Sequence, residues 1–501
     1  MSASPRPTPN AALSAQSAEK AVEYFRSRRI ILPTFAELAD PRRIPPGIAQ
    51  QLADLDPMDP QPLNLFRVHW YNARHSRRPT AVPEYLELPA ALTGVSARII
   101  VLLGNRFPLI SAHKVLPAYA CLVPLIVSGS FDPTIHRAVW PSTGNYCRGG
   151  VAISRIMGCH GVAILPEGMS RERFDWLERW ALGPGDIIRT PGTESNVKEI
   201  FDKCAELEGS SDNVILNQFR EYGNYLAHYL CTGAALERVF ESVKARDPRA
   251  TARAFVAASG SAGTLGAGDY LKERYEVRIV AVEALECATL LENGFGSHNI
   301  QGIGDKHVPL IHNVMNNDIV VAVSDRITDR LNVLFNTPVG RSYLLDRRGV
   351  AERLVVELSS LGLSSICNVV AAIKTARYLN LAETDVVLTV ATDGADLYTT
   401  ELKKTLAADF AARFDTTSAG EVYGQCLAGA STADMLELNQ RERNRIFNLG
   451  YYTWVEQQGV AIEHFQARRD QAFWRELRAM LPIWDEMITD FNRRTGLLRE
   501  L

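Results

Sequence analysis

Short apolar runs that alternate with longer amphipathic segments are the feature that most constrains the fold of this chain. From residue 97 onward these runs are hydrophobic throughout rather than at every second position, which is typical of strands covered by helices on both faces. The runs that predict strands are residues 98–103, 161–166, 186–188, 213–216, 254–258, 277–282 and 385–390. Helical periodicity over 196–207 and 263–274 connects them. The pattern predicts an α/β protein with mainly parallel sheets.

Both ends of the chain depart from this alternation. Residues 1–95 form an N-terminal extension, with a predicted helix over 12–28 and proline-rich connections after it. Residues 401–501 are charged, aromatic and helical, and Trp454, Trp474 and Trp484 lie on amphipathic stretches. We therefore expect a core over 96–400 and a C-terminal helical extension that contains no strand.

Composition excludes several classes of protein. The net charge of -3 gives no reason to expect binding to nucleic acid or to an anionic membrane. The most apolar run, 115–127, is too short to cross a bilayer and contains two prolines. Residues 1–10 lack the order of a signal peptide. The spacing of the eight cysteines and of the histidines near the motifs fits neither a disulfide framework nor a metal site, so we expect a cytoplasmic protein without a metal.

A loop of small residues between a predicted strand and a predicted helix is the first candidate site. It contains Gly260, Ser261, Ala262, Gly263 and Thr264. Small residues let backbone N–H groups approach an anion, the hydroxyls add donors, and a helix N-terminus favours negative charge. Such loops also exist for tight packing alone, and this one does not have the sequence of a Walker loop. Glu283 at the end of the next strand leaves a nucleotide-binding oxidoreductase open as an alternative.

Two further constellations precede this loop. Lys114 follows a strand and begins an apolar helix, so burial lowers its pKa and prepares the amine for imine formation. A lysine that extends from a buried helix end to solvent is the alternative. The other constellation is Ser142, Thr143, Gly144 and Asn145 at a helix start, where hydroxyls and N–H groups either hold a carboxylate or only cap the helix.

The order of these pieces resembles that of one known family. The series consists of the lysine turn, then 142–145, 217–219, 260–264, 301–304 and 362–365. In this order and with these residues, the chain resembles the fold-type II pyridoxal-phosphate enzymes, which are tryptophan synthase β-like in fold, and within them the cysteine synthase and cystathionine β-synthase group. The resemblance covers about residues 97–400. It implies a two-domain core, a smaller mobile domain over about 130–245, and pairing into a homodimer.

The resemblance also implies roles for individual residues. Lys114 looks like the lysine that forms the Schiff base with pyridoxal 5′-phosphate and moves the α-proton. Residues 142–145 look like the loop that holds the substrate carboxylate, with Asn145 also reaching the cofactor's 3′-oxygen. Gln218 matches a glutamine that helps to hold substrate. Residues 260–264 match the phosphate loop, with Ala262 in place of a glycine, and Gly302 and Gly304 border the ring.

This chain departs from the family pattern at three places. Asp305, Lys306 and His307 put charge near the cavity, where small or apolar residues are usual. Ile366 replaces a glycine that is customary after Ser364 and Ser365. Near the end of the core, Thr392 and Asp393 stand where the family has an aspartate and then a serine. We expect Asp393, rather than Thr392, to face the pyridine nitrogen and to keep it protonated.

The resemblance implies an enzyme, a lyase or transferase, that catalyses β-elimination or β-replacement on a small amino acid of the serine, cysteine or O-activated serine type. An ammonia-lyase or dehydratase acting on serine, threonine or diaminopropionate is the alternative within the same fold. A non-catalytic cofactor-binding scaffold is the alternative of another class. The expected ligand is a small amino acid, with neither nucleic acid nor membrane as a partner.

Overall fold

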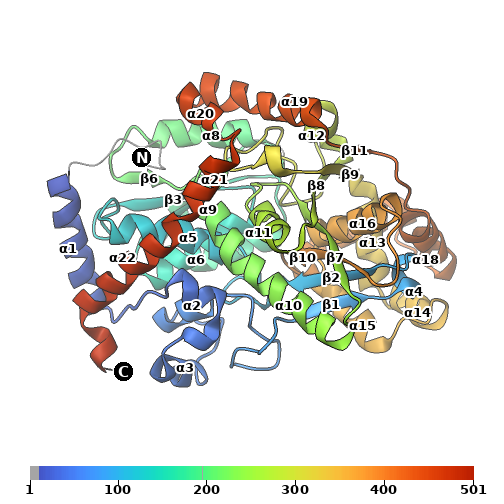
Figure 1. Ribbon diagram of the computed structural model, residues 1–501, viewed down its shortest axis with the longest axis horizontal. Coiled ribbons are helices and arrows are strands. Elements are labelled where there is room, and N and C mark those ends of the chain that lie inside the picture. Colours follow the sequence, from blue (N-terminus) through green and yellow to red (C-terminus); the bar gives the residue numbers. More distant parts are fainter. Residues whose placement is uncertain (1–10, 195, 501) are drawn as a thin grey trace.

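The apolar runs form two separate sheets in the computed structural model, which describes residues 11–194 and 196–500 (Figure 1). The larger sheet has seven strands in the order β1-β2-β10-β7-β8-β9-β11. Their bounds are β1 (Tyr85–Leu88), β2 (Arg98–Leu103), β10 (Asp385–Ala391), β7 (Thr251–Ala258), β8 (Arg278–Ala284), β9 (Ile319–Val323) and β11 (Met435–Glu437). The five central strands run parallel, and β1 and β11 pair antiparallel at the two edges.

The smaller sheet has four parallel strands in the order β5-β4-β3-β6. Their bounds are β5 (Ile187–Thr190), β4 (His160–Pro166), β3 (Arg137–Pro141) and β6 (Asn213–Ile215). Helices cover both faces: Trp140 faces α6 (Asn145–Ile156), and Val139 packs with Ile200 of α8 (Val197–Leu207). This sheet lies within the predicted smaller domain, and the predicted α/β class is confirmed.

The sequence pattern missed four strands. The expectation that residues 401–501 contain no strand is wrong, because β11 pairs with β9, with Met435 opposite Val321. β1 likewise lies in the segment assigned to the N-terminal extension and pairs with β2. Both are edge strands of three or four residues, too short for a periodic signal. The other two are β3 and β9, which are buried but brief.

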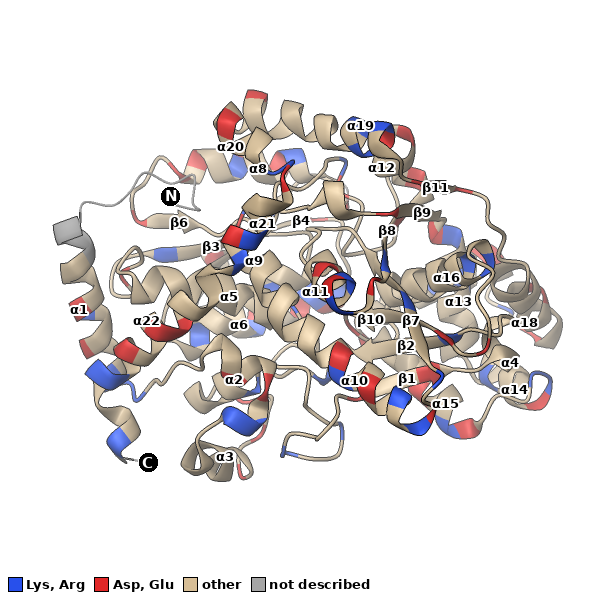
Figure 2. Cartoon of the chain, viewed as in Figure 1, with Lys and Arg blue, Asp and Glu red and all other residues tan. Residues whose placement is uncertain are grey.

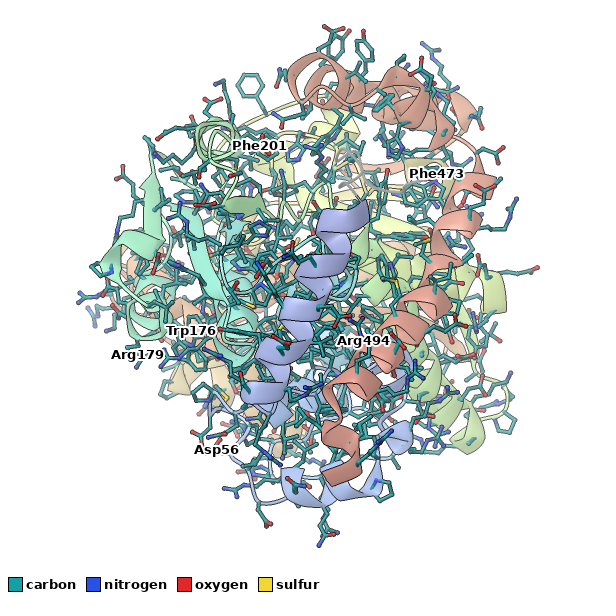
Figure 3. All side chains as sticks on the ribbon, turned by 90° about the vertical axis from the view of Figure 1, so that its left-hand side faces the viewer. Asp56, Trp176, Arg179, Phe201, Phe473 and Arg494 are labelled. Atoms are coloured by element: carbon teal, nitrogen blue, oxygen red, sulfur yellow. The ribbon has the colours of Figure 1, made fainter. Side chains whose placement is uncertain are left out.

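The two terminal extensions pack against each other on one side of the core. Helix α1 (Ala11–Ser27) lies beside α22 (Met480–Thr495), as Figures 1 and 3 show. The rings of Phe25 and Phe491 meet edge to face at 5.3 Å. The Asp485 carboxylate accepts the backbone N–H groups of Phe35 and Ala36 at 2.6 and 3.0 Å, at the start of α2 (Phe35–Ala39). Helices α1, α2 and α22 therefore form one helical layer.

This layer covers α5 (Val115–Val127), the apolar helix after Lys114. The Tyr119 hydroxyl donates to the carbonyl of Pro33 at 2.5 Å, and its ring contacts Phe35. The remaining C-terminal helices also pack on the core, where the Trp454 indole donates to the carbonyl of Val308 at 2.7 Å. The predicted C-terminal extension therefore packs directly on the core and forms an outer layer of it.

Charged side chains of both signs lie mainly on outer helices and loops and are intermixed there (Figure 2). In the described residues, none of the helices combines the length and the apolar character that a membrane span requires. Residues 1–10, which the sequence analysis examined for a signal peptide, lie outside the described residues.

Candidate active site

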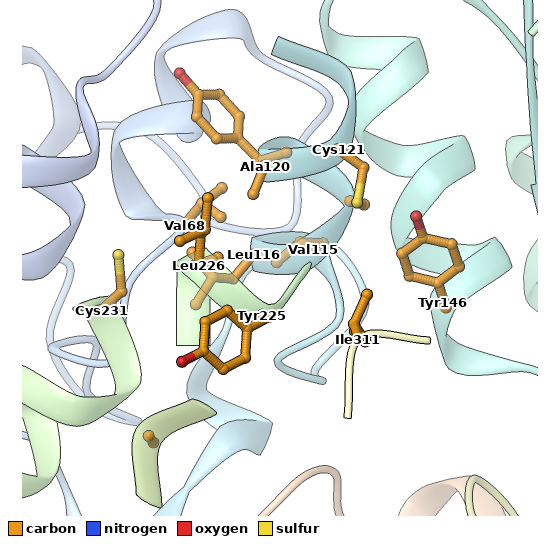
Figure 4. Packing of buried hydrophobic residues seen from close by; sticks show 14 of the residues in the cluster. Val68, Val115, Leu116, Ala120, Cys121, Tyr146, Tyr225, Leu226, Cys231 and Ile311 are labelled. Atoms are coloured by element: carbon orange, nitrogen blue, oxygen red, sulfur yellow. The ribbon is translucent and has the colours of Figure 1, made fainter. Parts of the chain in front are cut away.

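Lys114 lies in a turn between the start of α5 and the end of β10. It directly precedes α5, whose residues Val115, Leu116 and Cys121 are buried among neighbouring helices (Figure 4). The backbone N–H of His113 donates to the carbonyl of Thr392 at 3.1 Å, and Ala112 forms a bridge with Asp393. The turn that carries the lysine is therefore fixed to the end of β10, so that its side chain leaves the backbone from a rigid position.

The Lys114 amine lies in a cavity among polar side chains. It contacts the side-chain carbonyl of Gln218 at 3.1 Å and the hydroxyl of Ser261 at 3.4 Å. Removal from bulk water lowers its pKa to about 8, although the carboxylates of Asp305 and Glu194 partly oppose that shift. A lysine with such a pKa has a substantial neutral fraction at mild pH, as a nucleophilic amine requires.

The loop between β7 and α11 (Leu265–Tyr275) is an anion cup. Within the described part of the chain, the backbone N–H groups of residues 260–264 donate to no other protein group. A Cβ on Gly260 would collide with the carbonyl of Gly302, and a Cβ on Gly263 with the side chain of Asn224. Five backbone N–H donors at the start of a helix, without an acceptor among the described residues, match the hydrogen-bonding needs of a phosphate group.

Asn224 is a residue of this cup that the sequence analysis missed. It is fully buried, and its amide donates to the Ser261 hydroxyl at 2.9 Å and to the carbonyl of Gln218 at 3.0 Å. It therefore connects the cup to the glutamine that contacts Lys114. An asparagine in the sequence Tyr-Gly-Asn-Tyr carries no motif, so nothing in the sequence distinguishes it.

The turn from β3 into α6 forms another wall. The Ser142 hydroxyl accepts the backbone N–H of Gly144 at 3.0 Å and the Gln218 amide at 3.4 Å. Gly144 has a φ of 153°, and a Cβ there would lie 2.5 Å from Nε of Arg173. Asn145 donates to the Asp393 carboxylate at 2.5 Å and accepts from Arg148 at 2.8 Å.

Thr392 and Asp393 lie in different surroundings. The Thr392 hydroxyl lies 2.8 Å from that of Ser364, and both residues line the cavity. Asp393 is buried outside the lining, and its carboxylate accepts from Asn145 and, at 2.8 Å, from the Tyr398 hydroxyl. Burial raises the pKa of Asp393, while Arg173, Tyr398 and Asn145 oppose that rise.

A single cavity brings most of the predicted site residues together. Its wall includes the predicted residues Lys114, Ser142, Thr143, Asn145, Gln218, Gly260, Ser261, Ala262, Thr264 and Thr392. Gly144, Gly263 and Asp393 adjoin lining residues in the sequence but do not themselves line the cavity. Gly302 also lines the cavity, while Gly304 packs against His298.

Residues 305–307, which the sequence analysis expected to put charge near the cavity, contribute one residue to its wall. Asp305 lines the cavity, whereas His307 packs against Phe219 and Trp454. Glu194 lies behind the wall and was not found from the sequence, since no motif surrounds it. Its carboxylate accepts the backbone N–H of Gly302 at 2.7 Å, and burial, reinforced by Asp305, raises its pKa to about 8.

Glu283 has no part in this site. Its carboxylate accepts the backbone N–H groups of Leu290 and Leu291, both at 2.8 Å, at the helical turn α12 (Thr289–Glu292). The residue that left a nucleotide-binding site open is therefore a helix cap.

The fold and the cavity define a class of enzyme in which a lysine amine faces an anion cup across an enclosed site. Residues 92–393 match the family described as pyridoxal-phosphate dependent enzyme. This match covers more than half of the chain, and the protein belongs to that family. Pyridoxal phosphate fits the lowered pKa of the Lys114 amine, the backbone N–H donors of the cup and the cavity between them. The cofactor of this protein is therefore pyridoxal phosphate, as the sequence predicted.

Individual relatives match shorter stretches. The cysteine synthase of Staphylococcus aureus is 32% identical over 190 residues, which are 37% of this chain and 57% of that protein. The cystathionine beta-synthase of Saccharomyces cerevisiae is 32% identical over 197 residues, 37% of each chain. The chain thus matches little more than half the length of the first of these relatives.

Two solved structures show the same fold at low identity. One is an O-acetylserine dependent cystathionine beta-synthase from Helicobacter pylori, with a TM-score of 0.51 at 23% identity, covering 63% of this chain and 94% of that one. The other is a hydrogen sulfide-producing enzyme from Fusobacterium nucleatum, with a TM-score of 0.54 at 22% identity, covering 71% and 95%. More than a quarter of this chain lies outside each superposition.

Proposed function

We propose that this protein catalyses β-elimination or β-replacement on a small amino acid of the serine, cysteine or O-activated serine type. The observation that carries the proposal is the Lys114 amine 3.4 Å from the Ser261 hydroxyl of the anion cup. The names of the relatives, cysteine synthase and cystathionine beta-synthase, support this class of reaction. Pyridoxal phosphate, when bound, supplies an electron sink for the α-carbon of the amino acid.

The residues of the cavity have separate roles in proton transfer and in binding the cofactor and the substrate. Lys114 holds the cofactor and then takes the α-proton of the substrate, for which its pKa of about 8 suits it. The backbone of Gly260 to Thr264 holds the phosphate. Ser142, Thr143, Gly144 and Asn145, with Gln218 beside them, hold the substrate carboxylate.

At the pyridine nitrogen we propose Thr392 rather than Asp393, which the sequence favoured. The Thr392 hydroxyl lines the cavity beside Ser364, whereas the Asp393 carboxylate is occupied by Asn145 and Tyr398. Asp393 then acts on the cofactor only through Asn145, whose side chain it orients.

We also propose that the smaller domain, about residues 130–245, closes over bound substrate. Arg173 of α7 (Arg171–Trp180) supports this role, because its buried guanidinium reaches Gln301 and, at 3.0 Å, the Tyr398 hydroxyl. These partners lie outside the smaller domain, so the arginine is placed to hold the closed form.

The absorbance spectrum of the purified protein, followed by product analysis, tests the function. A band near the visible edge is expected in the wild type and in Lys374→Met, which removes a buried lysine outside the cavity, but not in Lys114→Ala. With serine, a thioether formed from an added thiol, or cysteine formed from added sulfide, indicates replacement, whereas keto acid and ammonia indicate the lyase alternative. A spectrum that Lys114→Ala leaves unchanged refutes the assignment.

We propose a cytoplasmic homodimer as the working form. All eight cysteines are buried free thiols, which suits a reducing compartment. Closed two-fold pairing is the commonest form of soluble oligomer. The mass of the purified protein in solution tests the dimer, and a monomer at micromolar concentration contradicts it.

A further inference from the structure

Asp305 is a carboxyl group in the cavity wall to which none of the roles above gives a task. The residue is 5% exposed and lines the same cavity as Lys114. Its Oδ1 atom is buried and has no hydrogen-bond partner among the described residues. A buried carboxyl oxygen without a donor is unfavourable in a folded protein, so its presence beside a lysine amine points to a task in the reaction.

The surroundings of Asp305 keep its proton exchangeable. Burial raises its pKa to about 7, and the Lys114 amine opposes that rise. The other titratable groups near it are Glu194, Cys287 and His307, whose ring nitrogen lies 2.8 Å from the Asp305 carbonyl oxygen. The cavity therefore holds an acid and an amine whose pKa values have been moved toward neutrality from opposite directions, as separate acid and base tasks require.

We propose that Asp305 is the acid–base residue for the β-substituent, a role that rests on the proposed function. Lys114 takes the proton from Cα, and the electron pair of that C–H bond becomes the second bond between Cα and Cβ. The Cβ–O bond of serine breaks with its electron pair on oxygen, Asp305 gives that oxygen its proton, and water leaves. When a thiol or amine then adds to Cβ, the second bond between Cα and Cβ breaks, its electron pair returns to Cα and takes the proton back from Lys114, and the proton of the nucleophile passes to the Asp305 carboxylate.

A second proton carrier determines which leaving groups the enzyme accepts. Hydroxide leaves only with a proton, and when Asp305 supplies it, Lys114 keeps the proton taken from Cα for its return to that carbon. Chloride and carboxylates leave as stable anions without one. A chain that has Asp305 in the cavity is therefore suited to unactivated serine, whereas an apolar residue there would restrict it to activated substrates.

The comparison of two substrates in one variant tests this role. Asp305→Asn keeps the shape of the side chain and removes its exchangeable proton. We expect its kcat/KM to fall about 10²- to 10⁴-fold with serine. With β-chloroalanine the loss should be at least about ten-fold smaller, since a general-acid contribution of that size is not needed there. Equal losses with the two substrates, or no loss with serine, overturn the proposal.

Two further measurements separate a failed role from a failed function. Exchange of the α-proton in D2O reports Lys114 alone and should persist in Asp305→Asn. A wild type that exchanges no α-proton refutes the proposed function itself. If Asp305→Asn lacks the cofactor band, Asp305→Glu takes its place, because it retains a carboxyl group at a shifted position. Its loss must again be larger with serine than with β-chloroalanine, and equal losses overturn the proposal.

Discussion

The Lys114 amine lies 3.4 Å from the Ser261 hydroxyl, although 147 residues separate the two in the chain. The sheet explains this distance. Lys114 follows β2 and Ser261 follows β7, and both strands pair in parallel with β10. The carboxyl ends of parallel strands meet at one edge of a sheet, which is where α/β folds place their ligands. Thr392, directly after β10, completes the group between the other two.

Gly263→Ala should weaken cofactor binding by at least about ten-fold. The new Cβ would collide with the Asn224 side chain, which holds the Ser261 hydroxyl at 2.9 Å. Displacing Asn224 also disturbs Gln218, whose carbonyl oxygen accepts from it. We expect a loss of more than about 1.4 kcal/mol in binding free energy, measured by titrating the cofactor into the cofactor-free protein.

The control for this change is Gly185→Ala. No atom lies within 4 Å of the position that a Cβ on Gly185 would take, and Gly185 is not among the residues that line the cavity. It should bind the cofactor as the wild type does. Unchanged affinity in Gly263→Ala would show that the cup does not depend on Asn224.

Thr392→Ala should alter the cofactor band, because the hydroxyl that it removes lines the cavity beside Ser364. Thr392→Ser keeps that hydroxyl and should preserve the band. Asp393→Asn should not alter the band as Thr392→Ala does, because the Asp393 carboxylate accepts from Asn145 and Tyr398 and does not face the cavity. The measurement is the pH dependence of the absorbance maximum in the three variants. If only Asp393→Asn shifts that dependence, Asp393 and not Thr392 faces the pyridine nitrogen.

Much of this arrangement could be predicted because it is local. Apolar runs such as 98–103 and 385–390 identify strands by composition alone, and the glycine-rich loop lies directly between a strand and a helix. The order of Lys114, the 142–145 loop and the cup along the chain then identified the family, which the match over residues 92–393 confirmed.

The remainder depends on contacts between distant segments. Asn224, Glu194 and Arg173 reach the site only because separate helices and loops converge there, and each stands in an ordinary local sequence. Strand β11 exists because the edge of β9 is free to pair, which three residues of sequence do not reveal. The choice between Thr392 and Asp393 also depended on Tyr398 and Asn145, which occupy the carboxylate.

Glu194→Gln should reduce the pH dependence of stability. Burial raises the pKa of Glu194 from 4.5 to about 8, so the folded protein keeps a proton that the unfolded chain releases within that window. The free energy of unfolding of the wild type therefore falls as pH rises from about 4.5 to 8. Glutamine cannot ionise and avoids this loss. Urea unfolding at pH 5 and pH 8 should show the variant gaining stability over the wild type, by on the order of 1–4 kcal/mol, mainly at pH 8.

The matched change is Glu421→Gln on α18 (Thr416–Tyr423), where the side chain is exposed. It should leave the difference in the free energy of unfolding between pH 5 and pH 8 as it is in the wild type. A Glu194→Gln protein whose stability changes with pH as much as that of the wild type would show that Glu194 is ionised in the folded state.

Phe491→Ala should destabilise the protein without changing its choice of substrate. The ring is 1% exposed and packs edge to face on Phe25 at 5.3 Å, where it joins the two terminal extensions over α5. Removing a buried phenylalanine ring costs about 3–5 kcal/mol. Chemical denaturation should show this loss, whereas Phe295→Ala, at a ring that is 81% exposed, should stay within about 0.5 kcal/mol of the wild type. Because the extensions lie behind α5 rather than in the cavity, the ratio of activity with serine to that with β-chloroalanine should match the wild type. A change in that ratio would mean that the terminal layer also sets the position of Lys114.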